Sequence, residues 1–249
     1  MERTNPSFAI VLPMYNEAEC AEKAIRLISE VLNGIPNPTK IIAVNDGSLD
    51  DTQIIVEKLL PQNERLVLLK HPVNRGYGGA VTTAIKYASQ EKIEYVLFMD
   101  CDLTQDPKYI KGFLGKMDEG YDIIKGSRYI KEGAVEGVPA WRVVISVVGN
   151  TIAKVLFGLP IRDYTNGFRA LKVSIAEQFH LTERGFSVLM EEIYQAKFIA
   201  HKYCEIPYTL SSRSEEQGTS TFSYRPRVIV SYLKYAMKSF LNVKPRHMK

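Results

Sequence analysis

One short stretch, from Tyr95 to Pro107, constrains the fold more than any other part of the chain. Residues 95–99 (Tyr-Val-Leu-Phe-Met) are dominated by β-formers and lead directly into Asp100 and Asp102. A short apolar run between two helical patterns is typical of a fully buried strand in a parallel sheet. The two carboxylates therefore follow the carboxyl end of a strand, which is where open α/β sheets bind their ligands.

The spacing of Asp100 and Asp102 indicates a cation site at this strand end. Two neighbouring carboxylates do not readily both ionise unless a cation lies beside them. Mg²⁺ and Mn²⁺ accept carboxylate oxygens and usually share them with substrate phosphates. The alternative is a polar turn that caps the next helix, because aspartate is common at such positions. The Asp-x-Asp pattern is short and frequent, so by itself it leaves both interpretations open.

The first half of the chain alternates strands with helices. Three further apolar runs predict strands, at residues 8–13, 40–45 and 66–70. This order predicts an α/β fold in which right-handed crossovers join the strands of a mostly parallel central sheet, flanked by helices. Pro13, Asp46 and Asp100 all lie at the carboxyl ends of predicted strands, so we expect all three at one edge of the sheet.

Two common nucleotide-binding motifs are missing. The turn from Pro13 to Glu17 has no glycine where the G-x-G-x-x-G motif requires one, and the chain contains no Walker lysine motif. The glycine cluster at residues 76–79 alone is consistent with close packing of a helix start on the sheet and with a phosphate contact.

Two apolar segments in the second half predict amphipathic C-terminal helices. Residues 141–157 carry polar side chains at intervals of four, namely Arg142, Ser146, Asn150 and Lys154. This pattern predicts a helix that lies on a membrane surface rather than one that spans it, and no apolar run is expected to reach transmembrane length. Residues 225–241 predict a final helix with basic side chains, and it too is a candidate for membrane attachment.

The net charge of the chain comes from its C-terminal end. Residues 217–249 contain seven Lys/Arg and no Asp/Glu, which leaves 25 basic and 28 acidic residues elsewhere. A basic tail on a mildly acidic body indicates an anionic partner such as a membrane surface, and we expect no nucleic acid. We therefore divide the chain into a domain at residues 1–222 and a basic amphipathic helix with its tail at residues 223–249.

Cysteine usage and the N-terminus bear on location. Cys20, Cys101 and Cys204 are far apart and show no metal spacing, which is typical of free thiols in a reducing compartment. The first residues do not read as a signal peptide. We expect a cytoplasmic protein.

Six motifs, in this order, resemble those of family-2 glycosyltransferases. They are residues 12–17 (Leu-Pro-Met-Tyr-Asn-Glu), 44–48 (Val-Asn-Asp-Gly-Ser), 74–80 (Asn-Arg-Gly-Tyr-Gly-Gly-Ala), 100–102 (Asp-Cys-Asp), 126–129 (Gly-Ser-Arg-Tyr) and 163–169 (Asp-Tyr-Thr-Asn-Gly-Phe-Arg). The likeness covers roughly residues 7–222 and is strongest to dolichyl-phosphate mannose synthases and other polyprenyl-phosphate hexose transferases. It implies a GT-A fold, a nucleotide-sugar donor, Mg²⁺ or Mn²⁺, and an inverting displacement at the anomeric carbon.

The resemblance also implies which residues bind the donor. The nucleotide pocket would be formed by Pro13, Tyr15, Glu17, Val44 and Asp46. The donor and the metal would be held by the strand-end group Asp100, Cys101 and Asp102. The leaving diphosphate would be neutralised by Arg128 and Arg213, because an arginine fork suits phosphate oxygens.

Further residues lie on or beside family motifs. Relatives commonly have Gln two residues after the second Asp, whereas Thr104 occupies that place here and Gln105 follows, so either could be the third metal ligand. Ser220 matches a serine after the motif arginine, although the lysine that often follows is replaced by Thr221. Arg169 and Glu191 are candidate substrate contacts. For Arg169 a structural ion pair is the alternative.

We expect a hexosyltransferase that moves mannose or glucose from GDP-mannose or UDP-glucose to dolichyl or polyprenyl phosphate. It would be attached peripherally to the cytoplasmic face of a membrane, and a membrane subunit is a candidate partner. Two alternatives stay open. One is a family-2 transferase that acts on a glycan or protein hydroxyl, with Glu191 or Asp102 as general base. The other is a nucleotide-sugar-binding protein without catalysis.

Overall fold

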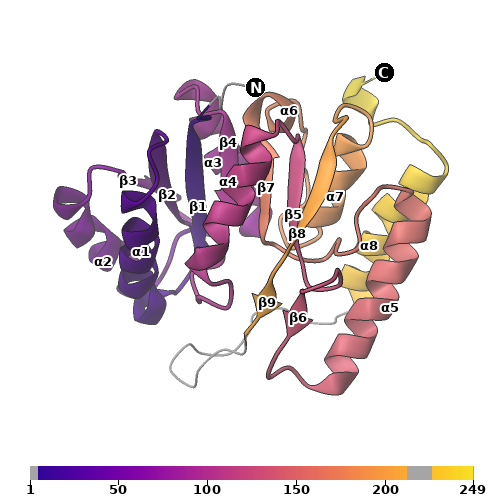
Figure 1. The fold of residues 1–249 in the computed structure, drawn as a ribbon, viewed down its shortest axis with the longest axis horizontal. Helices are drawn as coiled ribbons and strands as arrows, with labels where there is room; N and C mark the ends of the chain where they lie inside the picture. The colour runs from indigo at the N-terminus through magenta and orange to yellow at the C-terminus, as the bar shows by residue number, and fades with distance from the viewer. Residues whose placement is uncertain (1–4, 212–225, 249) are drawn as a thin grey trace.

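A single seven-stranded sheet forms the centre of the computed structural model, which describes residues 5–211 and 226–248 (Figure 1). The strand order is β3-β2-β1-β4-β7-β5-β8. The strands are β1 (Phe8–Met14), β2 (Thr39–Asn45), β3 (Leu66–Lys70), β4 (Tyr95–Phe98), β5 (Ile123–Ser127), β7 (Arg169–Lys172) and β8 (Tyr203–Pro207). All neighbours pair in parallel except β7, which is antiparallel to both β4 and β5. The predicted mostly parallel α/β sheet is confirmed.

Helices cover both faces of this sheet. They are α1 (Ala18–Asn33), α2 (Thr52–Leu59), α3 (Tyr77–Gln90), α4 (Ile110–Asp118), α5 (Ala140–Phe157), α6 (Val173–Ala176), α7 (Val188–Ala196) and α8 (Pro226–Phe240). Because side chains of a strand alternate between faces, Ile10 of β1 packs with the α1 and α4 layer, whereas Val11 packs with the α3 and α7 layer. Each face thus has its own apolar core.

The position of β7 brings two halves of the chain to one sheet edge. The carboxyl ends of β1, β2, β4 and β5 share an edge because these strands run in the same direction. The antiparallel β7 starts at that edge, so the loop before it lies there as well. A small second sheet of β6 (Ala134–Val135) and β9 (Thr209–Leu210) lies beside this edge (Figure 1).

Helix α5 exposes its apolar side and buries polar residues. The Asn150 side chain is buried and accepts hydrogen bonds from the backbone N–H groups of Tyr164 and Thr165. The Ser146 hydroxyl accepts a hydrogen bond from Tyr129. Most of the exposed side chains of α5 are apolar: Trp141, Val144, Ile145, Val147, Val148, Ile152 and Val155.

The sequence predicted that no apolar run would reach transmembrane length, and α5 shows that this prediction is wrong. Its 18 residues are long and apolar enough to cross a membrane, and 17% of them are buried. Core helices of soluble proteins also meet this criterion, so length and composition alone do not make α5 a membrane span. The predicted last helix is confirmed as α8, which packs against α5 and α7 (Figure 1).

Candidate active site

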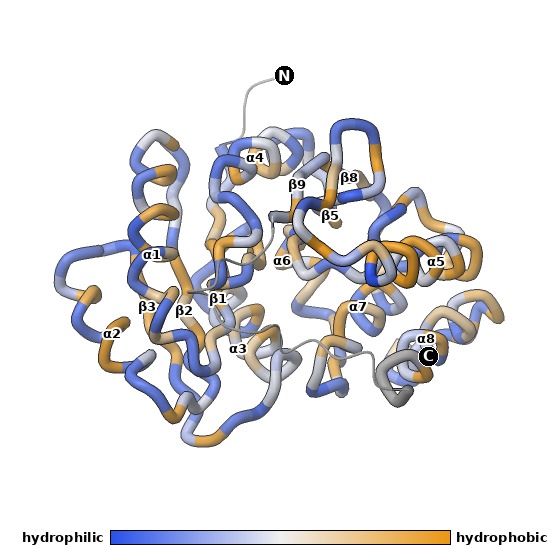
Figure 2. The backbone as a smooth tube through the Cα atoms, turned by 90° about the horizontal axis from the view of Figure 1, so that it is seen from below, coloured by the Kyte–Doolittle hydropathy of each residue, from blue (hydrophilic) through white to orange (hydrophobic). Residues whose placement is uncertain are grey.

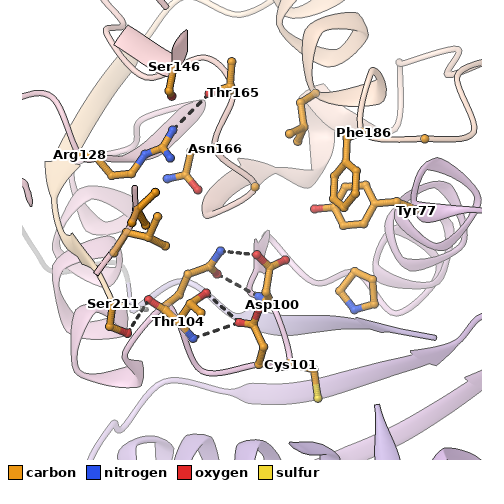
Figure 3. A pocket seen from close by; sticks show the side chains of 18 of the residues that line it. Tyr77, Asp100, Cys101, Thr104, Arg128, Ser146, Thr165, Asn166, Phe186 and Ser211 are labelled. Atoms are coloured by element: carbon orange, nitrogen blue, oxygen red, sulfur yellow. Dashed lines mark hydrogen bonds between the residues drawn. The ribbon is translucent and has the colours of Figure 1, made fainter. Parts of the chain in front are cut away.

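A cavity of about 640 Å³ opens at the carboxyl edge of the sheet (Figure 3). Its walls come from the segments that follow β1, β2, β4 and β5, from the loop before β7, and from the starts of α3 and α5. Most of the predicted site residues line it: Pro13, Tyr15, Glu17, Asp46, Asp100, Cys101, Asp102, Thr104, Gln105 and Arg128. Residues far apart in the sequence therefore form one site.

Three predicted site residues do not line this cavity. Val44 is fully buried in the core between β2 and α3. The Arg169 guanidinium donates two hydrogen bonds to Glu192, 2.6 and 2.5 Å long, so the structure confirms the ion-pair alternative. The Glu191 carboxylate is 3% exposed and accepts hydrogen bonds from Thr182 and Glu183. Arg213 and Ser220 lie outside the described residues.

The loop after β4 holds its two carboxylates through its own side chains. Gln105 donates from Nε2 to Asp100 Oδ2 over 2.7 Å, and its Oε1 accepts the Asp100 N–H over 2.9 Å. Thr104 donates to Asp102 Oδ1 from its backbone N–H and from its hydroxyl, at 3.0 and 2.7 Å. Leu103 between them has a φ of 59°, in the left-handed region, which closes this tight turn. Gln105 and Thr104 thus orient the carboxylates.

The donor set fits a hard divalent ion. Asp100 and Asp102 supply carboxylate oxygens at the cavity wall, and Mg²⁺ is typically bound by one or two carboxylates together with substrate phosphates. No group of three or more His, Cys, Asp or Glu side chains suited to a metal occurs in the part of the chain that the structure describes. An ion at this site would therefore depend on the substrate for part of its coordination shell.

Asp46 is fixed at the end of β2 by three donors. Its carboxylate accepts the backbone N–H groups of Arg75 and Gly76, each at 2.8 Å, and contacts His71 Nδ1 at 2.5 Å. The other ring nitrogen of His71 contacts the hydroxyl of Thr83 at 2.8 Å. The buried histidine therefore orients Asp46.

Arg128 lies across the cavity from Asp100 (Figure 3). Its Nε and Nη2 donate to the two oxygens of the fully buried Asp163, at 2.7 and 2.8 Å, and Nη2 also reaches the Thr165 hydroxyl at 3.2 Å. This two-pronged contact fixes the plane of the guanidinium. A cation that is already oriented loses little freedom when a phosphate binds.

Lys125 holds the loop before β7 in place through hydrogen bonds to its backbone. Its Nζ is fully buried and donates to the backbone carbonyls of Asn166, at 2.5 Å, and Tyr164, at 3.5 Å. Burial, together with the positive charge of Arg169, lowers the pKa of Lys125 to about 7. Asn166 and its neighbours in the loop line the cavity, so Lys125 supports the site without touching it.

The sequence interpretation missed several residues of the cavity. The side chains of Tyr77 and Phe186 stack at 4.9 Å between ring centroids, and Arg142 reaches the cavity from α5. The glycine cluster gave a signal for Tyr77. These glycines do allow close packing, but the contact is with the segment before α7 and not with the sheet, because a Cβ on Gly78 would lie 1.9 Å from the Glu183 carbonyl oxygen. That contact brings Phe186 to Tyr77 from a segment far along the chain.

Comparisons with known proteins agree with this arrangement. A family model described as "Glycosyl transferase family 2" matches residues 9–179. A dolichol-phosphate mannosyltransferase of Pyrococcus furiosus is 30% identical over 87% of this chain and 61% of its own length. A polyprenol monophosphomannose synthase of Mycolicibacterium smegmatis is 28% identical over 86% of this chain and 80% of its own length. The chain thus spans less than two thirds of the length of the Pyrococcus furiosus relative.

Solved structures show the same fold. Glucosyl-3-phosphoglycerate synthase of Mycobacterium tuberculosis, in complex with Mn²⁺, UDP-glucose and phosphoglyceric acid, superimposes with a TM-score of 0.69 and 17% identity, over 97% of this chain and 82% of that one. The same enzyme with Mg²⁺ and UDP gives a TM-score of 0.64 and 18% identity, over 97% of this chain and 81% of that one. The predicted GT-A fold is confirmed.

Proposed function

The chain belongs to glycosyl transferase family 2, and we propose that it transfers a hexose from a nucleotide sugar to a polyprenyl phosphate. One observation carries this proposal. A single cavity combines strand-end carboxylates with three arginines, Arg128, Arg142 and Arg184, and it extends to α5, whose outer face is largely apolar. The names of the two relatives favour mannose as the sugar and a polyprenyl phosphate as the acceptor.

The donor would bind on the side of β1, β2 and β4. Asp46 and Glu17 offer carboxylate oxygens to ribose or base groups. Asp100 and Asp102 would hold Mg²⁺ or Mn²⁺, which when bound offsets charge on the diphosphate. Arg128 would supply a fixed positive charge close to the leaving group, where charge develops during an inverting displacement.

The acceptor would enter from the side of α5. A phosphate monoester has a second pKa of about 6, so it is mostly a dianion near neutral pH and needs no base to attack the anomeric carbon. Arg142 and Ser146 lie on the inner side of α5 and line the cavity, where they could hold such a phosphate. The attached hydrocarbon chain would then lie along the exposed apolar face of the same helix.

This arrangement also supports peripheral attachment to a membrane at the cytoplasmic face. The helices α5 and α8 lie side by side at one end of the molecule (Figure 2). Apolar side chains of α8 are exposed as well, among them Val230, Leu233 and Phe240. Basic residues near an anionic surface contribute about 1 kcal/mol each, so the basic C-terminal tail would strengthen this attachment.

The test is direct transfer. The protein is incubated with GDP-mannose or UDP-glucose, together with a short polyprenyl phosphate or the matching polyprenol, with and without a chelator. We expect a glycosylated lipid phosphate from one donor, with no product when the chelator is in excess. Equal transfer to the polyprenol would favour a hydroxyl acceptor, and donor binding without any product would favour a non-catalytic protein.

A further inference from the structure

Tyr77 is held in an unusual environment for a residue that lines the cavity. Its hydroxyl oxygen accepts a hydrogen bond from Arg169 Nη1 at 2.9 Å. Arg169 is 1% exposed and is itself fixed by Glu192 and by the carbonyl of Gly167. The guanidinium also lies 4.2 Å from the centre of the Phe98 ring. The buried Arg169–Glu192 ion pair therefore contacts the cavity wall through one hydroxyl group, that of Tyr77.

This contact decides what the Tyr77 hydroxyl can do. A guanidinium only donates hydrogen bonds, so Tyr77 must use an oxygen lone pair for Arg169, and its own proton is directed elsewhere. Within the part of the chain that the structure describes, the hydrogen bond to this oxygen comes from Arg169. Burial raises the pKa of Tyr77 to about 12, so the hydroxyl keeps its proton at neutral pH.

Gly167 leaves a gap between Tyr77 and Asp100. A Cβ on Gly167 would lie 3.3 Å from the Tyr77 hydroxyl oxygen and 3.7 and 3.9 Å from the carboxylate oxygens of Asp100. Both polar groups therefore lie beside the position that Gly167 leaves without a side chain, and even a Cβ there would make a tight contact with the Tyr77 hydroxyl. All three residues line the cavity, and Phe186 stacks on the Tyr77 ring next to this gap (Figure 3).

We propose that Tyr77 and Asp100 form a subsite for one hydroxyl group of the transferred sugar. A hydroxyl can accept from the Tyr77 O–H and donate to the Asp100 carboxylate at the same time. An ionised phosphate oxygen suits this gap poorly, because it can accept from the Tyr77 O–H but has no proton to donate to the Asp100 carboxylate. The Phe186 and Tyr77 rings offer an apolar surface to the carbon side of a sugar. This inference rests on the proposed function.

In this arrangement, Arg169 and Glu192 are positioning residues. They fix the direction of the Tyr77 hydroxyl and do not touch the sugar. A site built to hydrogen-bond a hydroxyl discriminates against the analogue that lacks it. The subsite would therefore contribute to the choice among hexose donors.

The test removes one hydroxyl group from the protein and one from the donor sugar, separately and together, and compares the rates of transfer. Wild-type protein and Tyr77→Phe are compared with the donor that the wild type uses, GDP-mannose or UDP-glucose, and with each monodeoxy analogue of its sugar. The variant keeps the ring that stacks on Phe186. We expect kcat/KM to fall roughly tenfold with the parent donor, the size of one lost hydrogen bond. With one deoxy analogue the two proteins should be equal.

A matched control and a binding measurement complete the test. Tyr203→Phe also removes one buried hydroxyl, but Tyr203 lies on β8 outside the cavity, so we expect wild-type kinetics. Calorimetry should show weaker binding of the nucleotide sugar to Tyr77→Phe and unchanged binding of the nucleoside diphosphate. Glu192→Gln should reduce kcat/KM with the parent donor more than with that same deoxy analogue.

The failures of the two proposals can be told apart. If the wild-type protein transfers no hexose from either donor, the proposed function fails, and the subsite fails with it. If the wild type is active and Tyr77→Phe matches it, the subsite alone is overturned. An equal loss with the parent and with every deoxy analogue overturns it too, because Tyr77 would then not act through a sugar hydroxyl.

Discussion

Each carboxylate at the end of β4 has a neighbour that holds it, Gln105 for Asp100 and Thr104 for Asp102. A change of charge at Asp102 should therefore affect chemistry more than folding. We predict that Asp102→Asn, which keeps the size of the side chain, reduces kcat about 100-fold or more, as expected when a main electrostatic contact to the leaving group is lost. Transfer kinetics and thermal unfolding measure the two effects.

The control for this substitution lies a few residues away. Asp106→Asn removes the same charge from an exposed side chain that caps a short helical turn and does not line the cavity. It should retain nearly full activity. Wild-type turnover by Asp102→Asn, or by the wild type in excess chelator, would contradict the assigned role.

The Arg169–Glu192 pair allows a stability prediction at the residue scale. Both side chains are 1% exposed, so removal of one partner leaves a buried charge without its counterion. Glu192→Ala should lower the free energy of unfolding by about 3–5 kcal/mol. Glu22→Ala breaks an exposed pair with Arg26 and should cost less than about 1 kcal/mol. Urea unfolding of both variants checks this, and equal losses would argue against it.

At the scale of elements, α5 shows what a sequence pattern can and cannot specify. The spacing of its polar residues predicted a helix with two unlike faces. It did not specify that Ser146 and Asn150 would face inward, because that depends on partners such as Tyr129 and the loop before β7, which lie elsewhere in the sequence. The strands at residues 8–13, 40–45 and 66–70 were easier to predict, since buried parallel strands are continuous apolar runs.

The outward face of α5 leads to a prediction on membrane binding. Val148→Glu places a charge on a side chain that is 52% exposed, so the fold should tolerate it. Binding to anionic liposomes should weaken roughly tenfold, because burial of a valine contributes about 1.5 kcal/mol. Ile54→Glu puts the same charge on a half-exposed residue of α2, at the other end of the molecule, and should bind as the wild type does (Figure 1). Liposome flotation measures the binding of both variants. Equal binding of the two would argue against membrane attachment through α5.

Strand β5 carries a prediction on pH. The pKa of Lys125 is about 7 in the folded protein, below its ordinary value of 10.5. Between these values the unfolded chain binds a proton that the folded chain lacks, so stability rises with pH by at most about 1.4 kcal/mol per unit. Lys125→Met cannot titrate. The free energy of unfolding of the wild type, relative to this variant, should therefore increase from about pH 7 to about pH 9, and a constant difference in urea unfolding would contradict this.

For the whole molecule, the sequence predicted the donor side of the cavity better than the acceptor side. Asp46, Asp100 and Asp102 each follow a strand, so sheet topology alone brings them together. Arg142 and Phe186 reach the cavity through the packing of α5 and of the segment before α7, which no local pattern specifies. The same limit explains Glu191, which lies on a family motif but holds backbone N–H groups outside the cavity.

The role of Glu191 distinguishes a hydroxyl acceptor from a phosphate acceptor. A hydroxyl acceptor needs a general base within hydrogen-bond reach, whereas a phosphate dianion does not. With a polyprenyl phosphate, we expect kcat/KM to rise with pH through about 6, the second pKa of the phosphate, and then to level off. Glu191→Gln should follow the same profile within a few-fold of the wild type, because this side chain does not line the cavity. Initial rates from about pH 5 to pH 8 measure both, and an inactive Glu191→Gln with normal donor binding and normal stability would support a hydroxyl acceptor instead.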